Sequence, residues 1–166
     1  LFICSAAYIM EELTIPNHPA IPKNIIIKNT TKRHLPLTQG VLKRCARNAL
    51  RLSGKKYTGL SLGISFFSDG RIKKLNQKYF KTNTPTDVIA FPYSKDNADI
   101  AISLDTAKRN ARIYKSSLKK EILLYIIHGI LHLNGYDDTT PREKKRMFKK
   151  QEEIFKKLSC QPKSRH

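Results

Sequence analysis

The stretch HGILHLNGYDD, which begins at His128, contains side chains whose types and spacing suit metal binding. His128 and His132 are four residues apart, so on a helix their imidazoles lie on one face and can reach the same cation. Gly135 can adopt the left-handed conformation that ends a helix and turns the chain back. Asp138 can then supply a carboxylate oxygen, and Asp137 is the nearby competitor. Two nitrogens, one oxygen and an open position for water are typical of a catalytic zinc site.

A helix can also carry two histidines at this spacing for packing alone. The run LKKEILLYIIHGILHL, from Leu118, is apolar nearly all round, which predicts a helix buried in the core. An imidazole without a polar partner in such a place costs free energy. This burial, the glycine after the helix and the carboxylate beyond it together favour metal binding over packing.

The spacing His-x-x-x-His-x-x-Gly-x-x-Asp agrees with that of metzincin peptidases except at two positions. Those peptidases place a glutamate directly after the first histidine as general base, and here that residue is Gly129. Glu121 lies two turns earlier, roughly 10 Å along the helix axis from His128, which is too far to act directly. The pattern therefore argues against peptide hydrolysis.

Periodicity and turn residues predict the elements that position these side chains. Strands are predicted from Asn24, from Leu60 to Phe67, from Thr86 and from Ala98. One helix is predicted between Thr38 and Gly54, a second from Asp69, and a third that Asp105 caps. A fourth is predicted from Leu118, and a fifth from Thr140 and Pro141 to about Leu158. Strands and helices mix without strict alternation, so we expect an α+β fold. It has a small mixed sheet of about four strands packed with about five helices, and the central buried helix carries the histidines.

Length and composition limit the domain organisation. The chain has 166 residues, of which 40% are hydrophobic, enough for one domain with a single core. We predict this domain at 24–160, followed by a basic tail at 161–166. The proline-containing segment 1–23 is interpreted as a disordered extension or an artefact of start-site choice. Its apolar opening is too short for a membrane span, so no membrane partner is expected.

Charge and cysteines indicate the partner and the compartment. Lysine and arginine number 32 against 13 acidic residues, which gives a net charge of +19 that attracts polyanions. Nucleic acid or a ribonucleoprotein is therefore the first partner to consider, although a set of solvated lysines is the alternative. Cys4, Cys45 and Cys160 are far apart and lack CxxC spacing, which fits a reducing cytoplasm and no cysteine-type zinc site.

Three segments resemble the YbeY family, the bacterial endoribonucleases of ribosomal RNA maturation. They are LNQKYFKTNTPTDVIAFPY, ADIAISLDTAKRNA and LKKEILLYIIHGILHLNGYD, and the likeness spans roughly residues 24 to 155. The resemblance implies a metzincin-like fold and a metal-dependent, single-strand-specific endoribonuclease acting on small-subunit (16S) ribosomal RNA in maturation, quality control and late assembly. It also implies contacts with the small ribosomal subunit, a small-subunit ribosomal protein and an assembly GTPase.

The candidate site follows from the spacing and from the resemblance. One divalent ion, with zinc first and manganese or another ion as alternatives, would be held by His128, His132 and Asp138, and its bound water would act on the phosphodiester. Thr86 and Asp87 match the family's loop and are candidates for the pocket. Candidate phosphate contacts are Lys73, Lys74, Lys78, Lys81, Lys108, Arg109 and Arg112.

The sequence departs from the family at the site. The family's third ligand is histidine, where this chain has Asp138, and the family has arginine where this chain has Phe80. Phenylalanine cannot bind phosphate oxygens bidentately, and Lys81 is the nearest charge that could replace the arginine in catalysis. Besides the endoribonuclease, two functions therefore stay open. Phe80 and Asp138 favour a catalytically weak RNA-binding ribosome assembly factor, whereas Gly129 opposes a metzincin-type peptidase.

Overall fold

The computed structural model describes residues 24–54 and 59–159, and the segments predicted as extension and basic tail lie outside these ranges. A four-stranded sheet forms the frame. Its strands are β1 (Asn24–Asn29), β2 (Ser61–Phe67), β3 (Val88–Pro92) and β4 (Asn97–Ser103). The order is β1-β2-β4-β3; β1, β2 and β4 run parallel and β3 pairs antiparallel with β4. The predicted mixed sheet is confirmed, and β3 is one of its edges.

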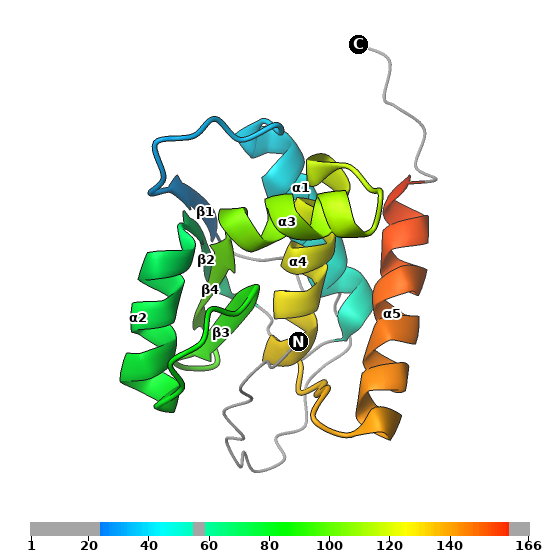
Figure 1. The fold of residues 1–166 in the computed structure, drawn as a ribbon. Helices are drawn as coiled ribbons and strands as arrows, with labels where there is room; N and C mark the ends of the chain where they lie inside the picture. The colour runs from blue at the N-terminus through cyan, green and yellow to red at the C-terminus, as the bar shows by residue number, and fades with distance from the viewer. Residues whose placement is uncertain (1–23, 55–58, 160–166) are drawn as a thin grey trace.

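Within the described ranges five helices pack around this sheet, as predicted (Figure 1). They are α1 (Gln39–Ser53), α2 (Asp69–Phe80), α3 (Leu104–Ile113), α4 (Leu118–Leu133) and α5 (Pro141–Ser159). α2 lies on one side of the sheet, α1 and α4 lie on the other, and α5 packs outside α4. No helix in the two described ranges is long and apolar enough to cross a membrane.

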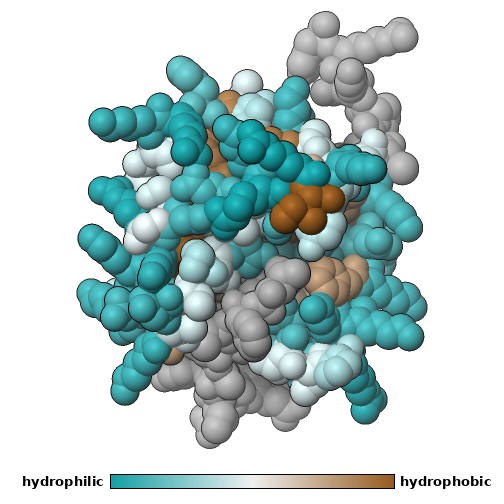
Figure 2. Space-filling model, in the orientation of Figure 1, coloured by the Kyte–Doolittle hydropathy of each residue, from teal (hydrophilic) through white to brown (hydrophobic). Residues whose placement is uncertain are grey.

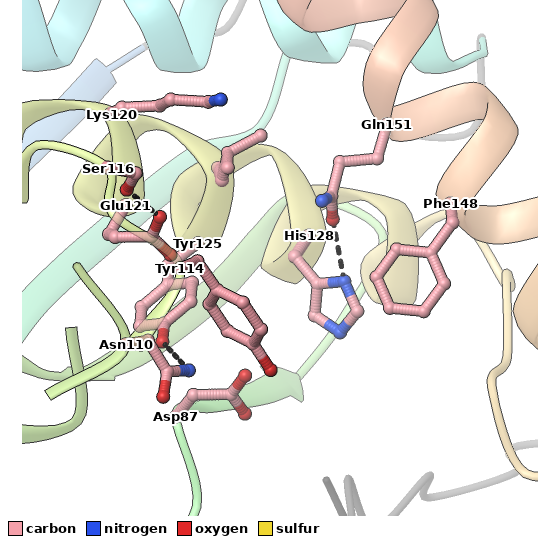
Figure 3. Close-up of a pocket in the computed structure, with 11 residues that line it drawn as sticks. Asp87, Asn110, Tyr114, Ser116, Lys120, Glu121, Tyr125, His128, Phe148 and Gln151 are labelled. Atoms are coloured by element: carbon pink, nitrogen blue, oxygen red, sulfur yellow. Dashed lines mark hydrogen bonds between the residues drawn. The ribbon is translucent and has the colours of Figure 1, made fainter. Parts of the chain in front are cut away.

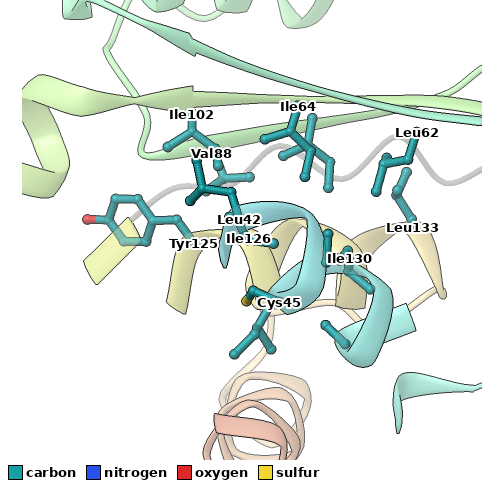
Figure 4. Packing of buried hydrophobic residues seen from close by; sticks show 14 of the residues in the cluster. Leu42, Cys45, Leu62, Ile64, Val88, Ile102, Tyr125, Ile126, Ile130 and Leu133 are labelled. Carbon is teal, nitrogen blue, oxygen red and sulfur yellow. The ribbon is translucent and has the colours of Figure 1, made fainter. Parts of the chain in front are cut away.

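The main core lies between the sheet and helices α1 and α4. Side chains alternate across a strand, so every second residue of β2 and β4 faces these helices and is buried. Figure 4 shows the contact from close by. Sheet residues Leu62, Ile64, Val88 and Ile102 face Ile126, Ile130 and Leu133 of α4 and Leu42 and Cys45 of α1. The apolar character of α4 is thereby explained, because the sheet, α1 and α5 all pack against it.

Gly129 lets α4 approach the sheet closely. A Cβ atom at this position would lie 2.7 Å from Cγ2 of Ile100, closer than real carbon contacts allow, and 3.0 Å from Cγ1 of Val88, which is also tight. The position at which a metzincin peptidase carries its glutamate is therefore filled by the sheet. Steric exclusion is a second argument against the peptidase, independent of the missing carboxylate.

The helix caps agree with the sequence except at α3. Thr38 caps α1 by accepting from the backbone N–H of Val41 at 3.4 Å. The prediction that Asp105 caps α3 is wrong: Ser103 is the cap and accepts from the N–H of Thr106 at 3.0 Å. Strand β4 runs into α3 without a loop, so the last strand residue takes the cap position. Asp105 lies in the first helical turn, where it accepts from the N–H of Asp69.

Candidate metal centre

The two histidines of α4 and an aspartate of the following loop converge on one point. Nε2 of His132 lies 3.2 Å from Nε2 of His128, and Oδ2 of Asp138 lies 3.9 Å from the latter atom. One ligand atom from each of the three residues can be chosen so that all lie within 4.8 Å of one another. The structure thus brings together the three residues that the sequence spacing predicted.

The backbone turn after α4 brings Asp138 back to the histidines. Gly135 has φ +80°, the left-handed conformation predicted for it, and its N–H donates to the carbonyl of His132 at 2.9 Å. The next N–H, that of Tyr136, donates to the carbonyl of Leu131 at 3.0 Å. Asp137 accepts from the N–H of Asp138 at 2.7 Å, so it supports the loop while its neighbour faces the histidines.

The start of α5 fixes the other end of this loop. Thr140 accepts from the backbone N–H of Glu143 at 3.3 Å, and the Glu143 carboxylate accepts in return from the N–H of Thr140 at 3.2 Å. This reciprocal pair is a capping box, which satisfies two otherwise unpaired N–H groups at the helix start. The loop that carries Asp138 is therefore held at both ends.

Hydrogen bonds to the far side of each imidazole fix its tautomer. Nδ1 of His128 lies 2.9 Å from Oε1 of Gln151, and Nδ1 of His132 lies 3.0 Å from the carbonyl oxygen of Tyr136. Both oxygens can only accept, so both Nδ1 atoms carry the proton. The Nε2 lone pairs then face each other at 3.2 Å, an arrangement that repels unless a cation lies between them.

The spacing of these donor atoms fits a divalent ion. Two Zn–N bonds of about 2.05 Å at a tetrahedral angle place the nitrogens about 3.3 Å apart. The observed 3.2 Å between the two Nε2 atoms agrees with this value. Oδ2 of Asp138, 3.9 Å from Nε2 of His128, needs only a small side-chain shift to join them. The donor set of two neutral nitrogens and one carboxylate oxygen suits zinc and other first-row divalent ions.

Burial puts the two imidazoles in the protonation state that binds a metal. It lowers the pKa of His128 to about 4, against a smaller opposing effect of the Gln151 hydrogen bond. Burial also lowers the pKa of His132 to about 4, and the neighbouring His128 adds to this shift. Both rings are consequently neutral at pH 7. Burial, with the charges of Asp137 and Asp87, raises the pKa of Asp138 to about 6.

An open pocket of about 380 Å³ adjoins His128 between α3, α4 and α5 (Figure 3). Its size is within the range of small-ligand sites. Its lining residues are Asp87, Asn110, Tyr114, Ser116, Lys120, Glu121, Leu124, Tyr125, His128, Phe148 and Gln151. Glu121 accepts a hydrogen bond from the Ser116 hydroxyl, toward the end of the pocket opposite Phe148. Aromatic walls beside the histidine give room for a flat or apolar group.

The two predicted pocket residues lie at the start of β3. Asp87 is buried and lines the pocket, and its Oδ1 accepts from the N–H of Val88 at 3.0 Å. Thr86 is also buried, and its hydroxyl lies 3.2 Å from the same oxygen. Burial raises the pKa of Asp87, although these hydrogen bonds oppose the shift. Asp87 is thus brought to the histidines from a distant part of the chain.

The predicted phosphate contacts lie on α2 and α3, and none of the seven is among the described residues that line the pocket. Exposed side chains on these two helices and just after α2 are Lys73, Lys74, Lys78, Lys81, Lys108 and Arg112. Arg109 differs, because its guanidinium forms an ion pair with Asp69 and donates to Thr106 at 2.8 Å. Lys81 ends α2 with a left-handed φ of 56°. Their contact with RNA stays a prediction.

Phe80 packs against the sheet on the side opposite α4. It belongs to a small apolar cluster with Ile72 and Ile89, and its ring lies 6.2 Å from that of Phe91. Phe80, at the position where the resemblance implies an arginine, therefore contributes packing in this chain and no charge.

Sequence reasoning missed Gln151, the partner of His128. A signal for it does exist, because Met147, Gln151 and Ile154 are the buried residues of α5 and recur at helical spacing. A glutamine on an otherwise apolar stripe needs a polar partner in the core. Which partner it finds depends on how α5 packs against α4, so the sequence alone could not name it.

Replacing Gln151 by leucine is expected to weaken zinc binding between about 10-fold and 100-fold, because the His128 ring loses the acceptor that fixes its tautomer. Competition with a chelator of known affinity measures the change. Gln77→Leu, at an exposed glutamine of α2, is the matched control and should bind zinc like the parent. Unchanged zinc affinity in the Gln151 variant would contradict the role of this hydrogen bond.

Fold and site together define a class: a small α+β protein whose central helix presents two histidines to an aspartate from the next loop, beside an open pocket. The family model described as Endoribonuclease YbeY matches residues 26–159. This chain belongs to that family.

Curated relatives agree with this assignment. Endoribonuclease YbeY of Chlorobium phaeovibrioides is 34% identical over 139 residues, covering 82% of this chain and 91% of the relative. The Sulfurihydrogenibium protein of the same name is 32% identical over 161 residues, covering 92% and 99% respectively. A solution structure from Thermotoga maritima has a TM-score of 0.52 at 24% identity, covering 86% of this chain and 99% of its own, and supports the fold.

Proposed function

We propose that this protein is a metal-dependent endoribonuclease that cuts single-stranded regions of small-subunit ribosomal RNA during ribosome maturation and quality control in the cytoplasm. Membership of the family and the names of the relatives support RNA cleavage. The observation that carries the metal dependence is the convergence of the two Nε2 atoms, 3.2 Å apart, beside an aspartate and an open pocket.

In this proposal His128, His132 and Asp138 hold one ion, most suitably zinc. When bound, such an ion stabilises negative charge on phosphate oxygens and makes water a better nucleophile at neutral pH. The protein keeps both imidazoles neutral by burial and orients them through Gln151 and the Tyr136 carbonyl.

The pocket residues bind and position the RNA next to the ion. Tyr125 and Phe148 provide flat surfaces against which a base or ribose can pack, and Lys120 supplies a positive charge among the described lining residues. Excluding water from this space strengthens the electrostatic interactions of the site. A single-stranded segment suits the pocket, since its bases can turn outward and those of a duplex cannot.

A second candidate is an assembly factor that binds ribosomal RNA and cuts it slowly or not at all. It is favoured by Phe80, which packs in an apolar cluster where the family carries arginine. One experiment distinguishes the endoribonuclease from the assembly factor. The purified chain is incubated with a single-stranded ribosomal RNA fragment, with zinc or manganese and then with excess chelator. Metal-dependent cleavage supports the endoribonuclease. Tight RNA binding without cleavage under every metal condition supports the assembly factor.

The zinc affinity of the chain is expected to be constant above about pH 7 and to fall about tenfold between pH 7.5 and pH 5. The metal-free carboxyl of Asp138 has a pKa of about 6, so below that pH a proton must leave before the metal binds. The histidines, with a pKa of about 4 each, stay neutral in this window and contribute little.

Chelator competition at both pH values measures this effect. The Asp138→Asn variant should bind zinc more weakly at both and lose the decline between them. A decline of the same size in the variant would show that another group competes with the metal.

A further inference from the structure

Exposed aromatic rings form a row on the side of the sheet away from the metal centre. The ring of Tyr79, at the end of α2, meets that of Phe91 edge-on with centroids 5.2 Å apart. Phe91 and Tyr93, on and just after β3, have nearly parallel rings 6.3 Å apart. Tyr79 is 55% exposed and Tyr93 is 65% exposed. We call Tyr79, Phe91 and Tyr93 the aromatic row.

Packing alone does not account for the aromatic row. Helical periodicity puts Tyr79 on the same side of α2 as Ile72 and Leu75, yet only Ile72 of the three is buried. Phe91 is half-buried against the small apolar cluster, whereas the two tyrosine rings project beyond it. Large exposed rings that contact one another form an apolar surface, and such surfaces are typical of binding sites.

Positive charge adjoins the aromatic row. The Lys78 ammonium lies 5.1 Å from the centroid of the Tyr79 ring, and Lys74 and Lys81 are exposed on and just after the same helix. Figure 2 shows extended hydrophilic side chains on the outer side of the molecule where α2 lies. One acidic group is close: Asp99 accepts from the Tyr93 hydroxyl at 3.2 Å and so holds that ring in place.

We infer that the aromatic row is a binding site for single-stranded RNA, on which successive bases stack while lysines of α2 contact the phosphates. Every base has a flat π-face, so aromatic rings bind single strands with little sequence preference, and nearby cations follow the backbone. Bases in a duplex are already stacked on each other and cannot use these rings. A net charge of +19 favours this polyanion over an apolar protein segment.

Edge strand β3 connects the aromatic row, on one face of the sheet, with the metal centre on the other face. At the start of this strand Asp87 lines the pocket beside His128, and Val88 packs at Gly129. Toward the other end stand Phe91 and Tyr93, about 10 Å and about 17 Å from Val88 by the rise of a strand. A strand of RNA lying along β3 can therefore reach both. The inference rests on the proposed function in taking RNA as the ligand.

The first test measures binding of a short fluorescein-labelled oligouridylate by anisotropy. The double variant Tyr79→Ala/Tyr93→Ala is expected to bind at least about 30-fold more weakly, because two stacking rings are lost at about 1 kcal/mol or more each. The variant Tyr79→Phe/Tyr93→Phe keeps both rings but loses the Tyr93–Asp99 hydrogen bond, so it should retain most of the affinity that the alanine variant loses. The dependence of affinity on salt between about 50 and 200 mM should be unchanged in the alanine variant, because no phosphate contact is lost.

A second test detects stacking directly. The chain has no tryptophan, so Tyr93→Trp introduces a single tryptophan whose selectively excited emission should be quenched by oligouridylate and not by an RNA duplex. Ile26→Trp, at a 47% exposed residue of the opposite edge strand β1, is the control and should show no quenching. Unaltered circular dichroism and zinc content establish that each variant is folded.

The inference would be overturned if the alanine variant and the parent bound oligouridylate equally, or if both tryptophans were quenched equally. The aromatic row would then be a site for a protein partner. These outcomes are separable from failure of the proposed function. If the parent binds oligouridylate and the fluorescence of the Tyr93→Trp variant is quenched by it, but RNA is never cut, only the endoribonuclease activity is contradicted. A chain that cuts with the rings removed and with unchanged KM contradicts only the aromatic row.

Discussion

The His128→Ala variant is expected to lose bound zinc and RNA cleavage together while keeping its fold. Its imidazole is one of two nitrogen donors, and two remaining ligands bind zinc weakly. In the proposed function a bound ion would supply several kcal/mol of charge stabilisation, so the cleavage rate should fall by more than about 100-fold. The buried Oε1 of Gln151 loses its partner, which should lower the free energy of unfolding by about 1–3 kcal/mol.

Metal content by elemental analysis, cleavage of single-stranded ribosomal RNA and thermal unfolding measure this prediction. At a zinc concentration of about 100 times Kd the parent gains about 2.7 kcal/mol, which should raise its Tm by roughly 5–10 °C. The variant should show no such rise. His34→Ala, at an exposed histidine, is the control and should behave like the parent. A His128→Ala protein that still cuts would place the chemistry elsewhere.

The Gly129→Glu variant, which would recreate the peptidase motif, is expected to unfold rather than gain activity. Its Cβ would lie 2.7 Å from Cγ2 of Ile100, a methyl group on a branched carbon that cannot move aside without changing the rotamer. The overpacking costs about 1–3 kcal/mol, and a buried unpaired carboxylate costs several more. The sum is comparable to the whole stability of a typical domain, about 5–15 kcal/mol.

Urea unfolding of two milder variants tests the steric argument on folded protein. Gly129→Ala gains helix propensity but meets the sheet, so its free energy of unfolding should fall by about 1 kcal/mol. Gly70→Ala, also within a helix, has nothing within 4 Å of the added Cβ and should be stabilised by up to about 1 kcal/mol. Equal effects of the two alanines would contradict the close approach of α4 to the sheet.

Asp138, where the resemblance implies a histidine, bears on the first of these expected results. A carboxylate binds zinc at about the same distance as an imidazole, so the ion can be kept, but its charge leaves bound water less acidic. Activity with manganese as well as zinc is a reasonable consequence of the harder ligand. Comparison of the parent with Asp138→His in the same cleavage assay addresses this directly.

The sequence alone determined the local part of the site. His128, His132, Gly135 and Asp138 lie within one helix and its following turn, where the 3.6-residue period and the left-handed glycine fix their relative positions. The elements were predictable for the same reason, since periodicity and caps act over a few residues. The prediction that Asp105 caps α3 was wrong because the start of this helix depends on where β4 ends.

Tertiary structure decided what lies around that site. Gln151 and Asp87 lie 23 and 41 residues from His128 in the chain, yet both come close to it in the fold. Phe80 meets Phe91 only because α2 packs on β3. These contacts depend on helix packing and strand order, which involve many weak interactions summed over the whole core. Local sequence patterns do not contain this information, so the candidate ligands could be predicted from the sequence and their supporting residues could not.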